Sequence, residues 1–152
     1  MNNNDVLRKI RYTFDYNDSK MVAIFKLADV EVDRTQITKW LKRDEDEDFE
    51  GIYDKQLAVF LNGFINLRRG KKEGEQPRPE KTLNNNLILR KLKIALDLKD
   101  TDVLDLLNLA DFRLGKSELS AFFRKPDHKH FRLCKDQVLR NFLHGMQIKF
   151  KK

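Results

Sequence analysis

Apolar side chains recur along the chain at the spacing of an amphipathic helix. In the first such stretch the apolar positions are Val6, Leu7, Ile10 and Phe14. Residues that lie three or four apart share one face of a helix, and similar stripes continue to the C-terminus. No stretch alternates apolar and polar residues with the period of two that a half-buried strand requires. The pattern therefore predicts an all-α protein.

The whole pattern repeats after 82 residues. Residues 2–70 match residues 84–152 without a gap, and 17 of the 69 positions are identical. A match of this length indicates a tandem duplication. We predict a first helical repeat at 1–69, a linker at 70–82 and a second helical repeat at 83–152, with four helices in each repeat.

Two features that occur in both repeats have structural explanations. Each repeat opens with Asn-Asn-Asn, and asparagine accepts hydrogen bonds from the free N–H groups of a helix start. We therefore expect Asn3 or Asn4, or their equivalents in the second repeat, to be the N-cap of the first helix. Gly63 and Gly145 fall within the fourth helix of each repeat, where glycine costs about 1 kcal/mol relative to alanine. Their presence predicts a close helix crossing.

The second and third helices of each repeat form a segment like the helix-turn-helix of bacterial repressors. In the first repeat Asp33 can cap the third helix, and Ile37 and Trp40 can face the core. The polar positions that could then reach base edges are Arg34, Thr35, Gln36 and Lys39. One departure is Glu31, which stands where such turns usually have glycine. A helical hairpin that packs on the core or contacts another protein is therefore the alternative.

Charge distinguishes the repeats. Residues 1–82 contain 16 Lys+Arg and 16 Asp+Glu, whereas residues 83–152 contain 15 and 8, for a net charge of +7. Such an excess favours a polyanionic partner such as nucleic acid, or an acidic protein surface, although it can also serve solubility alone. The positions in the second repeat that could contact nucleic acid lie on and after its third helix: Lys116, Ser117, Ser120, Arg124, Lys125, Lys129, Arg132 and Lys135.

The loop after the third helix is acidic in the first repeat, at 44–50, and basic in the second, at 126–132. Phe49 and Phe131 are common to both loops, and we expect them to anchor the loops to the core. Loops of opposite charge could pair within one chain or between chains. A protein-interaction role, including self-association, is therefore the second functional hypothesis.

Little in the sequence indicates catalysis, a metal or a cofactor. His128, His130 and Cys134 could ligate a metal, but their spacing is a weak signal, and a solvated loop beside a buried cysteine explains them better. Neither a nucleophile motif nor a glycine-rich phosphate loop is present. A single cysteine, a polar N-terminus and no long apolar run favour a cytoplasmic protein without a membrane span.

Several motifs resemble the YehS-like family of small bacterial proteins over the whole chain. They are the Asn-Asn-Asn starts, Leu-Ala-Asp at 27–29 and 109–111, Arg-Lys-Pro-Asp-His-Lys at 124–129, and Gly-Lys-Lys-Glu-Gly at 70–74. The resemblance implies a bacterial cytoplasmic protein with two copies of a domain of unknown function, and it assigns no site residue. From the residues we expect a non-enzymatic protein that binds nucleic acid through its second repeat. The alternative is a protein-interaction module that uses grooves between the repeats and the oppositely charged loops.

Overall fold

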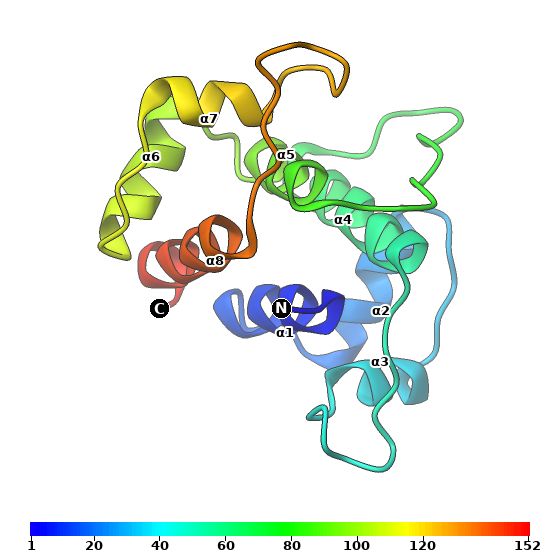
Figure 1. Cartoon of the computed structure of the whole chain (residues 1–152). Helices are drawn as coiled ribbons and strands as arrows, with labels where there is room; N and C mark the ends of the chain where they lie inside the picture. Colours follow the sequence, from blue (N-terminus) through cyan, green and yellow to red (C-terminus); the bar gives the residue numbers. More distant parts are fainter. The chain divides into compact units, whose positions relative to one another are not determined.

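The computed structural model describes residues 1–152 and contains eight α-helices and no strand (Figure 1). The all-α prediction is confirmed. None of the helices has both the length and the apolar composition that crossing a bilayer requires. The chain divides into two compact units, Met1–Leu83 and Asn84–Lys152.

The helices of the two units start at equivalent positions. The first unit contains α1 (Asn3–Thr13), α2 (Asp18–Leu27), α3 (Arg34–Leu41) and α4 (Asp54–Arg69). The second contains α5 (Asn85–Ala95), α6 (Asp100–Leu109), α7 (Lys116–Phe122) and α8 (Asp136–Phe150). Each start in the second unit lies 82 residues after its counterpart, and only α7 and α8 end one residue earlier than the repeat would place them. The prediction of four helices in each repeat is therefore confirmed.

The segment expected to link the repeats, 70–82, contacts the first unit. The Lys71 ammonium lies 2.6 Å from a carboxylate oxygen of Asp29 in the turn after α2. Asn66 of α4 donates a hydrogen bond of 2.8 Å to the side-chain carbonyl of Gln76. The structure thus groups this segment with the first four helices.

In each unit the second and fourth helices cross at a glycine. A Cβ atom on Gly63 would lie 1.9 Å from the carbonyl oxygen of Ile24, and one on Gly145 would lie 1.9 Å from that of Leu106. No side chain fits at that distance, so the backbones touch only because glycine is present. The predicted close crossing is confirmed in both repeats.

Aromatic rings fill the core of the first unit. The ring of Phe25 lies 5.4 Å from that of Trp40 and 5.3 Å from that of Phe60, between ring centroids. Phe60 in turn stacks on Phe64. The second unit places Leu107, Phe122, Phe142 and Met146 at the equivalent positions, and these are all buried. Equivalent positions therefore form the core in both units, but different side chains occupy them.

The predicted N-cap of the first helix was off by one residue or more. The cap is Asn2 in the first unit and Asn84 in the second, and their side chains accept from the backbone N–H of Asp5 and Leu87. The second and third asparagines instead lie inside the helix, where their side chains reach other segments. The second helices, α2 and α6, begin after Asn17 and Lys99, and the Asn17 side chain accepts from the backbone N–H of Lys20.

The turn between the second and third helices is not the tight turn of a repressor. Its left-handed residue is Asp29 (φ 62°) in the first unit and Asp111 (φ 56°) in the second, directly after the C-cap alanine. In the first unit this is four residues before the cap Asp33, and not at Glu31. Apart from glycine, residues with short polar side chains such as aspartate tolerate the left-handed conformation best, which explains why aspartate stands at this position in both units. The departure noted in the sequence is thus real, although Asp33 does cap α3 by accepting from Gln36 N.

Candidate nucleic-acid interface

One buried asparagine in each unit positions the loop that follows the third helix. In the second unit the Asn86 amide donates to the carbonyls of Phe122 (3.0 Å) and Arg132 (2.8 Å). Its side-chain oxygen accepts from the N–H of Cys134 (2.9 Å). Both N–H groups and the oxygen of the buried amide are therefore directed at the two ends of the loop.

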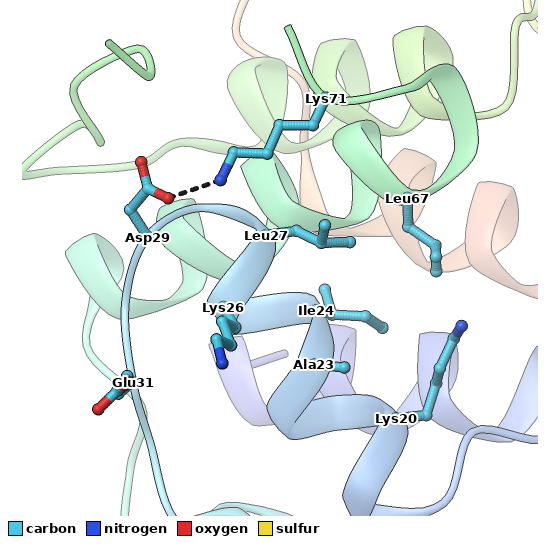
Figure 2. A pocket seen from close by; sticks show the side chains of 9 residues that line it. All are labelled: Lys20, Ala23, Ile24, Lys26, Leu27, Asp29, Glu31, Leu67 and Lys71. Carbon is cyan, nitrogen blue, oxygen red and sulfur yellow. Dashed lines mark hydrogen bonds and ion pairs between the residues drawn. The ribbon is translucent and has the colours of Figure 1, made fainter. Parts of the chain in front are cut away.

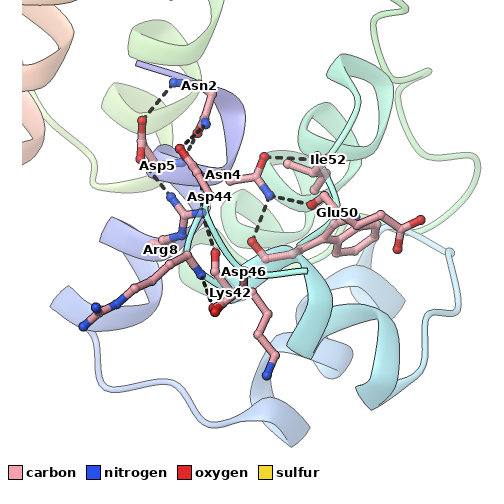
Figure 3. Close-up of polar contacts among 11 residues, drawn as sticks. Asn2, Asn4, Asp5, Arg8, Lys42, Asp44, Asp46, Glu50 and Ile52 are labelled. Atoms are coloured by element: carbon pink, nitrogen blue, oxygen red, sulfur yellow. Dashed lines mark hydrogen bonds and ion pairs between the residues drawn. The ribbon is translucent and has the colours of Figure 1, made fainter. Parts of the chain in front are cut away.

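The first unit repeats this arrangement (Figure 3). Asn4 donates to the carbonyls of Trp40 (2.8 Å) and Glu50 (2.9 Å) and accepts from the N–H of Ile52 (3.1 Å). One residue earlier, Asn3 donates to the carbonyl of Ile52 at the end of the loop and to the Asp54 carboxylate at 2.7 Å. Asn85 donates in the same way to the carbonyl of Cys134 and to the Asp136 carboxylate, also at 2.7 Å. The hydrogen bond from Asn85 lowers the pKa of the Asp136 carboxyl.

The loops themselves have the same backbone hydrogen bonds despite their opposite charges. Arg132 N donates to Ala121 O at 3.2 Å, and Glu50 N donates to Lys39 O at the same distance. The expected aromatic anchors are only half-buried at Phe49 and Phe131. The asparagines therefore hold both ends of each loop by hydrogen bonds, and the anchoring role of the two half-buried rings stays a prediction.

In the second unit the predicted contact residues surround this loop. Lys116 and Ser117 lie in the exposed first turn of α7, and Ser120 is half-buried. The cations that follow are exposed: Arg124, Lys125, Lys129, Arg132 and Lys135. Arg124, Lys125 and Lys129 make no ion pair within the chain, so these charges remain available to an external anion.

In the first unit the predicted contact residues are partly occupied. Arg34 donates to the Ser19 hydroxyl, and Gln36 donates to a carboxylate oxygen of Glu50 at 3.0 Å. Thr35 and Lys39 are exposed and line a shallow polar cavity of about 370 Å³ together with two acidic residues of the preceding turn. The two side chains best suited to read bases are therefore engaged elsewhere.

Arg90 of α5 is a candidate that the sequence analysis missed. Its equivalent Arg8 makes ion pairs with Asp5 (2.9 Å) and Asp44 (2.7 Å). In the second unit these acidic positions are Leu87 and Pro126, so Arg90 has no carboxylate partner there. It is exposed and donates to the carbonyl of Phe123 (2.6 Å), immediately before Arg124. Comparison of the two repeats at the positions that surround this arginine could have identified it.

Cys134 is buried at the end of the loop, whereas His128 and His130 are exposed. Burial, followed by the negative charge of Asp136, raises the pKa of the Cys134 thiol to about 12. A protonated thiol is a poor metal ligand and a poor nucleophile. The structure also contains no group of three or more His, Cys, Asp or Glu side chains close enough to hold a metal ion.

The first unit contains a surface cavity of about 630 Å³ between α2 and the end of α4. Ile24, Leu27 and Leu67 form its apolar floor. Figure 2 shows Lys20 and Lys26 on opposite sides of this floor, with the Lys71–Asp29 ion pair above it. The second unit has Asp102, Asn108 and Lys149 at the positions of Lys20, Lys26 and Leu67, so the lining of this cavity is not repeated there.

Comparisons with known proteins agree with the repeat. The model of the family described as "Protein of unknown function (DUF1456)" matches residues 3–70 and again residues 85–151. The chain is 44% identical to "Uncharacterized protein YehS" of Escherichia coli (strain K12) over 147 aligned residues. The aligned region covers 96% of this chain and 94% of that protein. No solved structure matches the chain. The resemblance found in the sequence is thus confirmed, and the chain belongs to the DUF1456 family, of which it carries two copies in tandem.

Proposed function

We propose that this chain is a non-enzymatic protein that binds nucleic acid through the second repeat, by loop 124–135 and the first turn of α7. The observation that carries the proposal is the cluster of exposed cations on this loop. Arg124, Lys125 and Lys129 have no acidic partner in the chain, and the neighbouring Arg90 has lost the two carboxylates that neutralise Arg8.

The physical basis is release of counterions from a phosphate backbone. Each cation that neutralises a phosphate releases condensed counterions, which favours binding at low salt. A fixed loop with several unpaired cations supplies such contacts without breaking ion pairs first. The first repeat cannot do the same, because six carboxylates occupy its loop 44–50 and would repel phosphate.

The test is fluorescence anisotropy with labelled DNA and RNA at rising salt. The triple variant Arg124→Glu, Lys125→Glu and Lys129→Glu should weaken binding by at least about 10-fold and lower the slope of log K against log salt by roughly 2 to 3. The matched control is Lys99→Glu, Lys149→Glu and Lys152→Glu, which removes the same charge from exposed positions outside the loop. Unchanged affinity in the first variant, or equal losses in both, would contradict the proposal.

A protein-interaction role is the second candidate, and the lysine-flanked apolar cavity of the first repeat favours it. Open apolar floors with charged margins suit protein partners as well as small ligands. Affinity capture with nuclease-treated and untreated lysate separates the two roles. Partners that disappear after nuclease treatment support nucleic-acid binding, whereas partners that remain support the interaction role.

A further inference from the structure

We infer that the nucleic acid bound by loop 124–135 is single-stranded, with its bases stacked on His128 and His130 and packed against Leu133. This inference rests on the function proposed above and names its substrate class. It comes from three observations: the small exposed surface of α7, two imidazole rings on the loop, and an exposed leucine beside them.

Helix α7 offers little to a DNA groove. It has seven residues and is therefore about 10 Å long. Only Lys116, Ser117 and Glu118 are exposed, because the following turn faces the core. Glu118 is acidic, and its carboxylate already accepts from the N–H of Gly115 at 3.3 Å. A helix that reads the major groove needs several polar side chains at its start, and here one of the three would repel phosphate.

The loop offers flat rings among its cations instead. His128 and His130 are exposed, and their ring centroids lie 5.5 Å apart with 41° between the ring planes. The backbone N–H of His130 donates to His128 Nδ1 at 3.0 Å, which fixes the first ring on the loop. Unpaired bases stack on aromatic and histidine rings, whereas paired bases inside a duplex present no free face.

Leu133 extends this surface. Its side chain is 66% exposed, compared with 46% for Leu109, the other exposed leucine. The equivalent residue in the first repeat is Gly51, and the equivalents of the two histidines are Asp46 and Asp48. The two rings and the leucine therefore occur only in the second repeat, together with Lys129 and Arg132, where the first repeat has Glu47 and Glu50. Apolar side chains beside stacking rings are typical of surfaces that bind unpaired bases.

The test compares three labelled probes with the full chain: oligothymidylate and oligouridylate of about 20 nucleotides, and a DNA duplex of the same length. All probes and variants are compared in one buffer. The variants are His128→Asn with His130→Asn, and Leu133→Ser. Asparagine at 128 retains an acceptor for the loop hydrogen bond. The matched controls are His144→Asn and Leu109→Ser, which alter exposed residues of α8 and α6.

We expect both single strands to bind more tightly than the duplex. Loss of both rings in the double histidine variant should weaken single-strand binding by at least about 30-fold and leave duplex binding unchanged. Duplex binding that equals or exceeds single-strand binding would overturn this inference and leave the proposed function intact. The same conclusion would follow if the double histidine variant bound single strands as tightly as the His144→Asn control. Absence of binding to all three probes would overturn both.

Discussion

Three consecutive asparagines have three different contacts, and this explains why both repeats contain all three. The first caps a helix, the second reaches the carboxylate that begins the fourth helix, and the third holds the loop. Successive helical residues point about 100° apart, so each side chain meets a different segment. The triplet therefore joins the first helix to residues 36–51 positions further along the chain.

The third asparagine should be the most important of the triplet for stability. In Asn4→Ala, one buried carbonyl, one part-buried carbonyl and one buried N–H lose their partner, and we expect the free energy of unfolding to fall by about 3 kcal/mol. Asn2→Ala removes a cap and should cost only about 1 kcal/mol. Urea titration followed by fluorescence of Trp40, the single tryptophan, reports on the first unit. Equal losses in the two variants would show that the buried amide is not the main link.

At Thr13, unlike at Asn4, we expect that removal of the polar group does not destabilise the first unit. Its side chain is 1% exposed and its hydroxyl has no hydrogen-bond partner, while the second repeat has the buried Ala95 at this position. Thr13→Ala removes an unsatisfied buried hydroxyl, so we expect the first unit to keep its stability or gain up to about 1 kcal/mol. The same Trp40 titration measures the change. A loss of more than about 1 kcal/mol would mean that the hydroxyl has a partner or that its methyl group packs better than expected.

At the level of the elements, the helix crossing at glycine fixes how the second and fourth helices of each repeat meet. Alanine at an ordinary glycine within a helix stabilises it by about 1 kcal/mol. At Gly63 the backbone of Ile24 occupies the space that a methyl group would need. Helix propensity and packing therefore predict changes of opposite sign at this position.

Gly63→Ala should therefore lower the free energy of unfolding of the first unit by at least about 2 kcal/mol, because the helices must separate. The matched control is Gly51→Ala, where an added Cβ would meet nothing within 4 Å. We expect that variant to lie within about 0.5 kcal/mol of the original chain. Thermal and urea unfolding measure both. A stabilised Gly63→Ala variant would show that the crossing adapts and that helix propensity decides.

The elements also show where sequence reasoning succeeds and where it fails. The helices and the glycine crossing could be predicted because periodicity and the duplicated glycine are local or repeated signals. The cap of the first helix was misplaced, since several adjacent asparagines can all accept the same hydrogen bond, and only geometry selects Asn2 and Asn84. Asn4, Asn86 and Arg90 could not be predicted from local pattern, because their partners lie 33 or more residues away.

For the molecule as a whole, the difference in charge between the repeats lies entirely in the two loops. Loop 44–50 carries six acidic residues and no basic one, whereas loop 126–132 has a net charge of +1. Outside these loops each repeat carries a net charge of +6. The first repeat therefore has a scaffold as basic as the second, and its acidic loop brings the net charge to zero. Both repeats therefore have the same basic scaffold, and only in the first repeat does an acidic loop neutralise its charge.

Exchange of these loops should consequently move the binding site. Because both loops have the same length, the same asparagine anchor and the same backbone hydrogen bonds, each should fold on the other scaffold. With 44–50 placed at 126–132, both repeats are neutral, and we expect affinity for nucleic acid to fall by at least about 10-fold. With 126–132 placed at 44–50, both repeats carry +7, and titration should reveal a second site or a steeper dependence on salt.

Circular dichroism first checks that both variants retain their helices. If the acidic exchange leaves affinity unchanged while the fold is intact, the loop is not the interface, and the basic scaffold common to both repeats would have to hold the ligand instead.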